Sequence, residues 1–174
     1  AQEHDKVYLV VTGEEVVAPG EEKHFTQELQ NYIEQNKLAD RVFLTGFVED
    51  ATAILNEADI VASASREESF GLAVLEGMAA GRAVVATDID GHCDLINHEI
   101  NGMLIPLDAE ELFAGAIKKL LLNKNMRLSM GEMARQRAEH FDQRTTMSQW
   151  TEFVEQIVRK SRSQTQGSER FNMS

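Results

Sequence analysis

The chain has 174 residues and a formal net charge of −12, because 29 acidic side chains outnumber 17 basic ones. This length allows one domain with a substantial core, and an apolar share of 43% with two prolines is typical of a globular protein rather than a disordered one. The acidic balance argues against a nucleic-acid or anionic-membrane surface, since both partners bind clustered cations.

Cysteine content and hydropathy set two further limits. Cys93 is the single cysteine, which excludes an internal disulfide framework and a multi-cysteine metal site. No run of 18 apolar residues and no basic-then-apolar N-terminus is present, so the sequence predicts neither a transmembrane segment nor a signal peptide. We therefore expect a cytoplasmic protein.

Short apolar runs alternate with helical patterns along the chain. The runs are rich in Val and Ile and bounded by Gly or Asp, which predicts strands buried on both faces of a parallel sheet over 7–12, 42–45, 60–64, 83–87 and 103–105. Apolar spacing predicts helices over 21–38, just after Asp50, after residue 71, and over 108–122, 125–140 and 144–162. This order predicts an α/β fold with a Rossmann-like, doubly wound parallel sheet and C-terminal helices.

Several residues have predicted structural roles in these helices. Asp108 and Glu111 form a variant of the capping box, with Asp108 as the cap. Gly81 is expected to end the helix that contains Glu76. Core positions are expected at Leu72, Val74, Leu75 and Met78, and close helix–sheet packing at Gly77, Ala79, Ala80 and Gly81. The polar segment 163–174 is expected to be a disordered tail.

The most informative stretch runs from Glu68 to Gly81. It follows a predicted strand, places Glu68 in a loop with a Phe-Gly step, and places Glu76 about two turns into a helix. Free N–H groups at the start of that helix can face an anion, and the Glu76 carboxylate can accept hydrogen bonds from hydroxyls. Ligands of parallel α/β sheets bind at the carboxyl ends of the strands, so the pattern favours a ligand with phosphates and hydroxyls, namely a nucleotide sugar.

This stretch resembles the Glu-x7-Glu signature of retaining nucleotide-sugar glycosyltransferases of group 1, the glycogen-synthase-like family. It reads Glu68-Ser69-Phe70-Gly71, then Glu76-Gly77-Met78-Ala79-Ala80-Gly81, followed by the strand 83–87. The segments 42–48, 58–65 and 101–106 also resemble the family, in order. The matched span, about 7–160, looks like most of the C-terminal, donor-binding domain of a GT-B enzyme.

The resemblance implies roles for individual residues. Glu68 would lie beside the donor sugar, where its charge favours oxocarbenium character, and Glu76 would hold the nucleotide ribose. The donor site would also include Ser69 and the backbone N–H groups of Phe70, Gly71 and Leu72, which would meet the diphosphate. The turn at Gly46 and Phe47 would meet the base. No metal and no cofactor is expected, because the nucleotide sugar is a co-substrate.

The chain departs from the family pattern in three ways. The family domain begins one strand earlier, with a basic loop that clamps the diphosphate, so residues 1–162 are expected to form a donor-binding domain lacking that strand and loop. The acceptor, a saccharide or glycolipid, would be bound by a missing N-terminal domain, and the full-length enzyme could be peripheral at the membrane. The usual Gly-Gly-x-x-Glu loop reads Asp90-Gly91-His92-Cys93-Asp94, and His92 is expected to be a partly exposed loop residue.

Two alternatives to a transferase stay open at this point. One is a non-catalytic nucleotide-binding or regulatory module, suggested by the missing basic clamp. The other is a sugar-nucleotide epimerase of the same fold. The absence of Gly-x-Gly-x-x-Gly after a strand argues against a dehydrogenase, and the absence of a Gly-Lys-Ser/Thr sequence argues against a P-loop enzyme.

Overall fold

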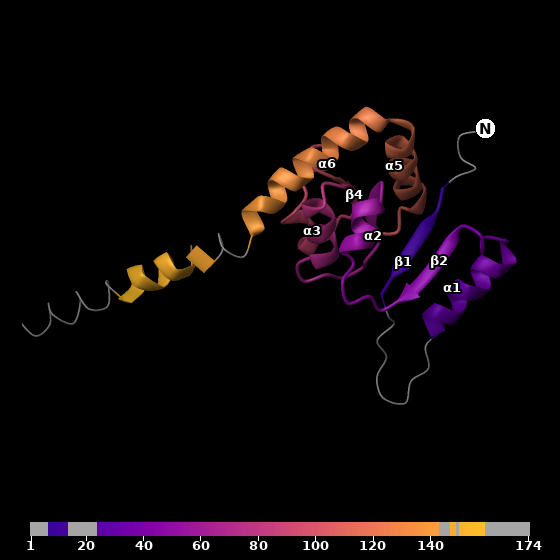
Figure 1. Cartoon of the computed structure of the whole chain (residues 1–174), viewed down its shortest axis with the longest axis horizontal. Helices are drawn as coiled ribbons and strands as arrows, with labels where there is room; N and C mark the ends of the chain where they lie inside the picture. Colours follow the sequence, from indigo (N-terminus) through magenta and orange to yellow (C-terminus); the bar gives the residue numbers. More distant parts are fainter. Residues whose placement is uncertain (1–6, 14–23, 143–146, 149, 159–174) are drawn as a thin grey trace, which may run out of the picture. The chain divides into compact units, whose positions relative to one another are not determined.

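The structure is a computed structural model that describes residues 7–13, 24–142, 147–148 and 150–158 (Figure 1). The chain divides into two compact units, Ala1–Ala51 and Thr52–Ser174, and each is described by itself. The predicted tail, 163–174, lies outside the described residues. Residues 147–148 and 150–158 are helical, within the range predicted for the last helix.

The first unit contains a pair of parallel strands and one helix. These are β1 (Leu9–Thr12), α1 (His24–Gln35) and β2 (Val42–Gly46). Leu9 lies opposite Val42 in the register, and a shift after Val11 places Thr12 opposite Gly46. The left-handed backbone of Gly46, with φ 67°, turns the chain at the end of β2.

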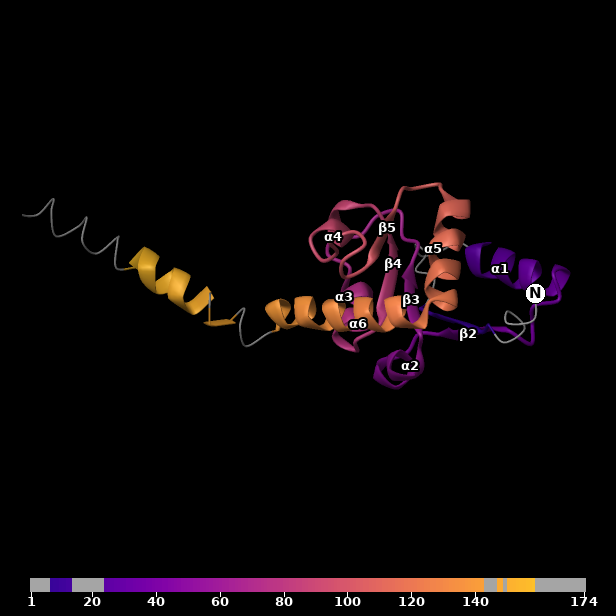
Figure 2. The ribbon, with the colours of Figure 1, turned by 90° about the horizontal axis from the view of Figure 1, so that it is seen from above.

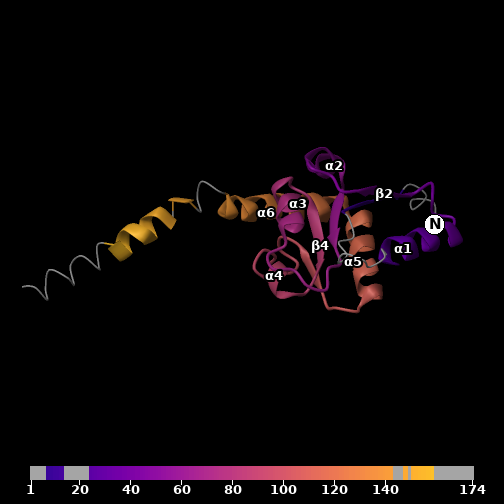
Figure 3. The same ribbon diagram turned by 90° about the horizontal axis from the view of Figure 1, so that it is seen from below.

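The second unit contains a three-stranded parallel sheet in the order β3-β4-β5. In chain order its elements are α2 (Thr52–Glu57), β3 (Ile60–Ser63), α3 (Leu72–Ala79), β4 (Ala83–Thr87), α4 (Asp90–Cys93), β5 (Met103–Ile105), α5 (Glu110–Leu122), α6 (Lys124–Ala138) and the 3₁₀ turn η1 (Glu139–Phe141). Figures 2 and 3 show α3 on one side of β4 and α5 on the other. The parallel sheets flanked by helices confirm the predicted Rossmann-like fold class.

Strand β4 is the centre of the second unit, and all five of its residues are buried. Val84 and Ala86 pack with apolar residues of α3 and α6, including Met78. On the opposite face, Ala83 and Val85 pack with residues of β5 and α5. This two-sided burial confirms the interpretation of the continuous apolar run, since only a strand covered on both faces has no polar alternation.

The end of α3 confirms the role predicted for Gly81. Gly81 has φ 70°, its N–H donates to the Met78 carbonyl, and the N–H of Arg82 donates to the Gly77 carbonyl. These two bonds form a Schellman motif, in which a left-handed glycine satisfies the last carbonyls of a helix. Helix α3 therefore ends where the sequence predicts.

The start of α5 differs from the predicted capping box. The helix begins at Glu110 with Ala109 as its N-cap, and no side chain provides a cap hydrogen bond there. Asp108 instead has a left-handed backbone, φ 57°, and its carboxylate pairs with the guanidinium of Arg66. The predicted cap is wrong because a cation from the loop after β3 binds the carboxylate.

Two of the predicted packing positions in α3 are also wrong. Val74 and Met78 are buried and Leu75 is partly buried, as expected. Leu72, the first residue of the helix, is 63% exposed. Ala79 is exposed as well, so of the small residues it is Gly77 that permits close packing: a Cβ there would lie 2.9 Å from the side chain of Val61.

We expect opposite effects of alanine at two helical glycines. A Cβ at Gly131 in α6 would lie 2.2 Å from the carbonyl oxygen of Gly81, whereas a Cβ at Gly115 in α5 meets nothing within 4 Å. Gly131→Ala should lower the free energy of unfolding by about 2 kcal/mol through overpacking, and Gly115→Ala should raise it by up to about 1 kcal/mol through helix propensity. Urea denaturation followed by circular dichroism measures both. Equal stabilities of the two variants would contradict the Gly81–Gly131 contact.

Candidate functional site

The candidate site is the loop that follows β3 together with the first half of α3. Ser63 ends β3, and α3 begins at Leu72, so the intervening loop lies at the carboxyl end of the sheet. Glu68 is exposed in this loop, and Glu76 is exposed in the second turn of α3. The structure thus brings Glu68, Ser69, Phe70, Gly71, Leu72 and Glu76 onto one loop and one helix.

The N-terminus of α3 is built to leave its backbone donors available. Gly71 is the N-cap, with a left-handed backbone at φ 83° and no side-chain cap hydrogen bond. The helical ladder begins with the N–H of Leu75, which donates to the Gly71 carbonyl at 2.9 Å. The N–H groups of Leu72, Ala73 and Val74 therefore have no partner within the helix and point out of its N-terminal end. Their partial positive charge favours an anion.

The loop is anchored in the core by the ring of Phe70. This ring meets Phe141 edge-to-face with 5.8 Å between centroids, and Phe70 packs against the core on the α3 side of β4. The guanidinium of Arg137 lies 4.9 Å from the Phe141 centroid, and its Nη2 donates to the carbonyl of Asp94 at 2.8 Å. These contacts hold the ring of Phe70, which is half-buried, against the core.

Helix α4 lies directly against this loop. A Cβ at Gly91 would lie 2.3 Å from the carbonyl oxygen of Glu68 and 3.0 Å from the backbone nitrogen of Phe70. A Cβ at Gly71 would lie 2.9 Å from Cδ2 of His92. The two backbones are therefore in contact at positions where a side chain would separate them.

His92 is fully buried, so the prediction of a partly exposed loop histidine is wrong. Its Nδ1 lies 2.8 Å from the Thr87 carbonyl oxygen, which only accepts, so Nδ1 carries the proton. Its Nε2 lies 3.4 Å from Ser63 Oγ. The ring is buried because the turn of α4 directs it under Gly71, between the ends of β3 and β4.

The two remaining predicted site residues belong to the first unit. Gly46 ends β2, and its carbonyl accepts from the N–H of Gly13 at 2.9 Å. Phe47 follows in the loop and is 72% exposed. The structure therefore places both at the carboxyl end of the other parallel sheet, as the sequence predicts for that turn.

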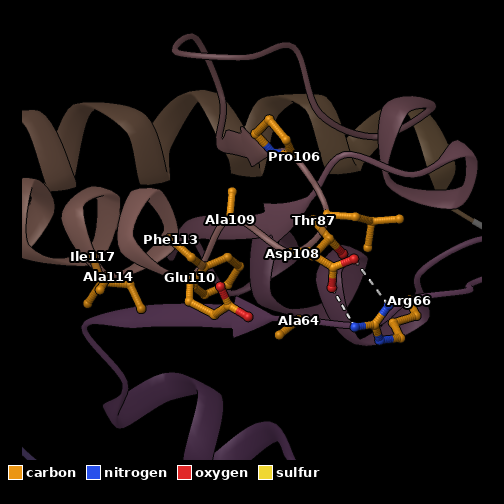
Figure 4. Close-up of a pocket in the computed structure, with 11 residues that line it drawn as sticks. Ala64, Arg66, Thr87, Pro106, Asp108, Ala109, Glu110, Phe113, Ala114 and Ile117 are labelled. Carbon is orange, nitrogen blue, oxygen red and sulfur yellow. Dashed lines mark hydrogen bonds and ion pairs between the residues drawn. The ribbon is translucent and has the colours of Figure 1, made fainter.

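An open pocket of about 340 Å³ lies at the carboxyl edge of the second sheet (Figure 4). It is lined by the ends of all three strands and by α5, through Ala64, Arg66, Thr87, Pro106, Leu107, Asp108, Ala109, Glu110, Phe113, Ala114 and Ile117. Figure 4 shows Arg66 directed at Asp108, with which it forms an ion pair. Arg66 is the cation of this lining, and its charge is already partnered.

The described residues contain no group of three or more His, Cys, Asp or Glu side chains arranged to hold a metal ion. They also contain no helix that is long and apolar enough to cross a membrane. Independence from metals and cofactors stays a prediction.

Cys93 has an unusually basic thiol for an exposed cysteine. Its Sγ donates to Oδ1 of Asp88 at 3.0 Å. This hydrogen bond, partial desolvation and the nearby carboxylates of Asp88, Asp90 and Asp94 raise the pKa of the thiol to about 11, because each disfavours the thiolate. Cys93 is therefore poorly suited to act as a nucleophile at neutral pH.

These features define a class: a Rossmann-like parallel sheet with an anion-ready helix start and two exposed carboxylates is the arrangement of the donor half of a GT-B glycosyltransferase. The family model for glycosyl transferases group 1 matches residues 1–137. The chain belongs to this family, which confirms the resemblance seen in the sequence.

Named relatives agree with this assignment. The chain is 35% identical over 98 residues to D-inositol 3-phosphate glycosyltransferase of Saccharomonospora viridis, a match that covers 56% of this chain and 23% of that protein. It is 31% identical over 120 residues to the putative glycosyltransferase EpsD of Bacillus subtilis, covering 69% of this chain and 32% of that protein. The chain thus spans about a quarter to a third of the length of these two relatives.

Solved structures show the same relationship in three dimensions. Anabaena HepE in complex with UDP superposes with a TM-score of 0.79 at 26% identity, covering 86% of this chain and 41% of HepE. The structure of a mutant of S. aureus TarM in complex with Fondaparinux, alpha-GlcNAc-glycerol and UDP gives a TM-score of 0.74 at 28% identity, covering 86% of this chain and 29% of TarM.

The sequence analysis did not identify the residues that pack against the loop between β3 and α3. His92 and Gly91 stand where the sequence departs from the family pattern, and that departure was the available signal for their importance. The Phe70–Phe141 contact has no comparable signal, because the two residues are far apart in the sequence.

We expect Cys93 to react slowly with thiol reagents. At pH 8 a pKa of about 11 leaves about 100-fold less thiolate than a pKa of about 9, and the higher intrinsic nucleophilicity of a basic thiolate returns about tenfold. The net rate of alkylation should therefore be roughly tenfold below that of a free thiol. Iodoacetamide labelling followed by mass spectrometry measures it.

The variant Asp88→Ala removes the main cause of the raised pKa and should accelerate labelling. Asp94→Ala is the matched control, because Asp94 makes the smallest contribution to the shift. Fast labelling of the unmodified chain at pH 8, or no acceleration in Asp88→Ala, would contradict the assigned hydrogen bond.

Proposed function

We propose that this chain forms the donor-nucleotide site of a glycosyltransferase that moves a sugar from a nucleotide-diphosphate sugar to an acceptor with retention of anomeric configuration. The observation that carries the proposal is the start of α3. The backbone N–H groups there have no hydrogen-bond partner within the helix, and they lie in the sequence between two exposed acidic residues, Glu68 and Glu76. HepE, which has the same fold at 26% identity, has structures in complex with UDP and with UDP-glucose. UDP is therefore the first nucleotide to test.

Each side chain has a distinct task in this proposal. The resemblance assigns the diphosphate to the backbone N–H groups of Phe70, Gly71 and Leu72. Of these, the N–H of Leu72 is one of the three at the helix start that precede the first helical hydrogen bond, and the helix dipole there stabilises the negative charge that grows as the leaving group departs. Glu76 accepts hydrogen bonds from the ribose hydroxyls. Glu68 accepts hydrogen bonds from the donor sugar and stabilises positive charge at the anomeric carbon. Ser69 completes the part of the donor site that lies in the second unit. The resemblance assigns Gly46 and Phe47, which belong to the first unit, to the base.

The acceptor is assigned to polypeptide outside this chain. The chain corresponds to 41% of HepE and 29% of TarM, so a further domain of the whole enzyme would bind the saccharide or glycolipid. The one cation of the described pocket, Arg66, is paired with Asp108. The resemblance implies a basic loop that clamps the diphosphate, and we assign that loop to the same outside polypeptide.

Binding of UDP tests the role of Glu76. Calorimetric titration of this chain with UDP, GDP and ADP should give saturable binding of one nucleotide, and Glu76→Ala should weaken it by about 10- to 100-fold, since hydrogen bonds to a charged acceptor contribute about 1.5–3 kcal/mol. Glu67→Ala is the control, because the Phe-Gly step places Glu67 outside the site. Equal affinity of wild type and Glu76→Ala would remove Glu76 from the site.

Sugar transfer by the full-length enzyme tests Glu68. Glu68→Gln keeps the size of the side chain but removes its charge, so we expect kcat to fall by roughly 100-fold or more with a smaller change in KM. Glu67→Gln should retain wild-type kcat. Proton NMR of the product should show the anomeric configuration of the donor, and an inverted product would overturn the retaining mechanism.

A further inference from the structure

The buried imidazole of His92 is the feature of the second unit that the proposed function leaves unexplained. His92 is fully buried, although its neighbours in the same short helix, Asp90 and Cys93, are exposed. Histidine is seldom fully buried without a polar partner, and a buried polar ring without hydrogen bonds would be costly. Its partners therefore show what it holds together.

The two ring nitrogens of His92 join the ends of neighbouring strands. Nδ1 donates to the carbonyl of Thr87, the last residue of β4, at 2.8 Å. In the neutral ring Nε2 then has a free lone pair, and it accepts from the hydroxyl of Ser63, the last residue of β3, at 3.4 Å. One planar side chain thus sets the separation of the two strand ends from which the site loops leave.

Hydroxyl groups extend this connection into the site loop. The Thr87 hydroxyl donates to the carbonyl of Ser65 at 2.5 Å, and the hydroxyls of Ser63 and Ser65 lie 3.3 Å apart. Ser65 is the second residue of the loop that leads to Glu68. The network therefore fixes the loop at its origin.

The ring of His92 also supports the far end of the same loop. Its Cδ2 edge occupies the space into which a Cβ at Gly71 would project, at 2.9 Å. Gly71 is the N-cap of α3, and its carbonyl accepts the first hydrogen bond of the helix. His92 thus touches both ends of the segment 65–71: the origin through hydrogen bonds and the helix start through van der Waals contact.

We propose that His92 is a positioning residue for the donor site, which holds the N-terminus of α3 in the orientation that receives the diphosphate. This inference rests on the proposed function for the identity of the ligand, but its structural part concerns the chain alone. His92 touches no substrate. It acts through Gly71 and Ser65, and its hydrogen bond to Thr87 is the interaction that matters most, because it is the shortest made by the ring.

Three variants at position 92 separate the parts of this role. His92→Leu fills the space without hydrogen bonds, His92→Asn can donate its amide to the Thr87 carbonyl, and His92→Gln can reach Ser63 but not both partners. Ala116→Gly is the control for general destabilisation, because Ala116 lies in α5 on the opposite face of β4. Melting temperatures of all four variants show which remain folded.

Amide hydrogen exchange gives a measurement that needs no ligand. The N–H of Leu75 reports on the helix start, because it donates to Gly71, and the N–H of Ala80 reports on the helix end, because it donates to Glu76. We expect His92→Leu to accelerate exchange at Leu75 by tenfold or more relative to Ala80, and His92→Asn to restore it. Ala116→Gly should leave the ratio of the two rates unchanged.

Titration with UDP then tests the functional part. His92→Leu should weaken binding by at least tenfold and His92→Asn should recover most of the loss. Wild-type exchange at Leu75 together with wild-type UDP affinity in His92→Leu would overturn the proposal, as would an equal loss in Ala116→Gly at the same melting temperature. If the wild-type chain binds no nucleotide, the proposed function fails for this chain, and the exchange ratios alone decide whether His92 positions the helix.

Discussion

The contact between the backbone of α4 and the loop after β3 is the constraint on which the candidate site depends. At Gly91 the separation leaves no room for a side chain, because the Glu68 carbonyl would lie 2.3 Å from a Cβ. Such an approach is open only to glycine. This close contact holds the backbone of Glu68 against α4, whereas the residue itself remains exposed to solvent. A rigid backbone that carries an exposed acid is what a preorganised site requires.

The sequence predicted the positions of the strands well, because a continuous apolar run is a local pattern. The predicted burial on both faces holds for β4, but it is wrong for β1 and β2, where Leu9, Val10 and Phe43 are exposed. Residues 83–86 are apolar and lie between two helical layers, and the predicted bounds 83–87 agree with β4 to the residue. The predicted bounds 103–105 agree with β5 as well. Helix starts were predicted less well, since a cap depends on competing partners. Asp108 has the right spacing for a cap, but Arg66, 42 residues away in the sequence, binds its carboxylate instead.

The same distinction between local and distant contacts applies to the site. The acids at 68 and 76 and the glycine at 71 form one short segment, so their pattern could be recognised and their placement on a loop and a helix predicted. The support beneath them could not be predicted, because the Ser63–His92 hydrogen bond joins residues 29 apart and Phe141 reaches Phe70 from η1. The spacing of apolar residues carries no information about such distant pairs. The sequence analysis therefore predicted a partly exposed loop residue at His92, which is fully buried.

The glycines of the signature act through packing, and this explains why a pattern of small residues accompanies the two acids. Gly77 allows α3 to approach the side chain of Val61 on β3, and Gly81 ends the helix beside Gly131 of α6. Because α3 is clamped at these two points, its N-terminus has one position relative to the carboxyl end of β3. The dipole of a helix acts only within its first turn, so an anion site there needs that fixed position. The small residues and the acids therefore act together: the packing at Gly77 and Gly81 fixes the position of the N-terminus of α3, and this position determines where its dipole can stabilise an anion.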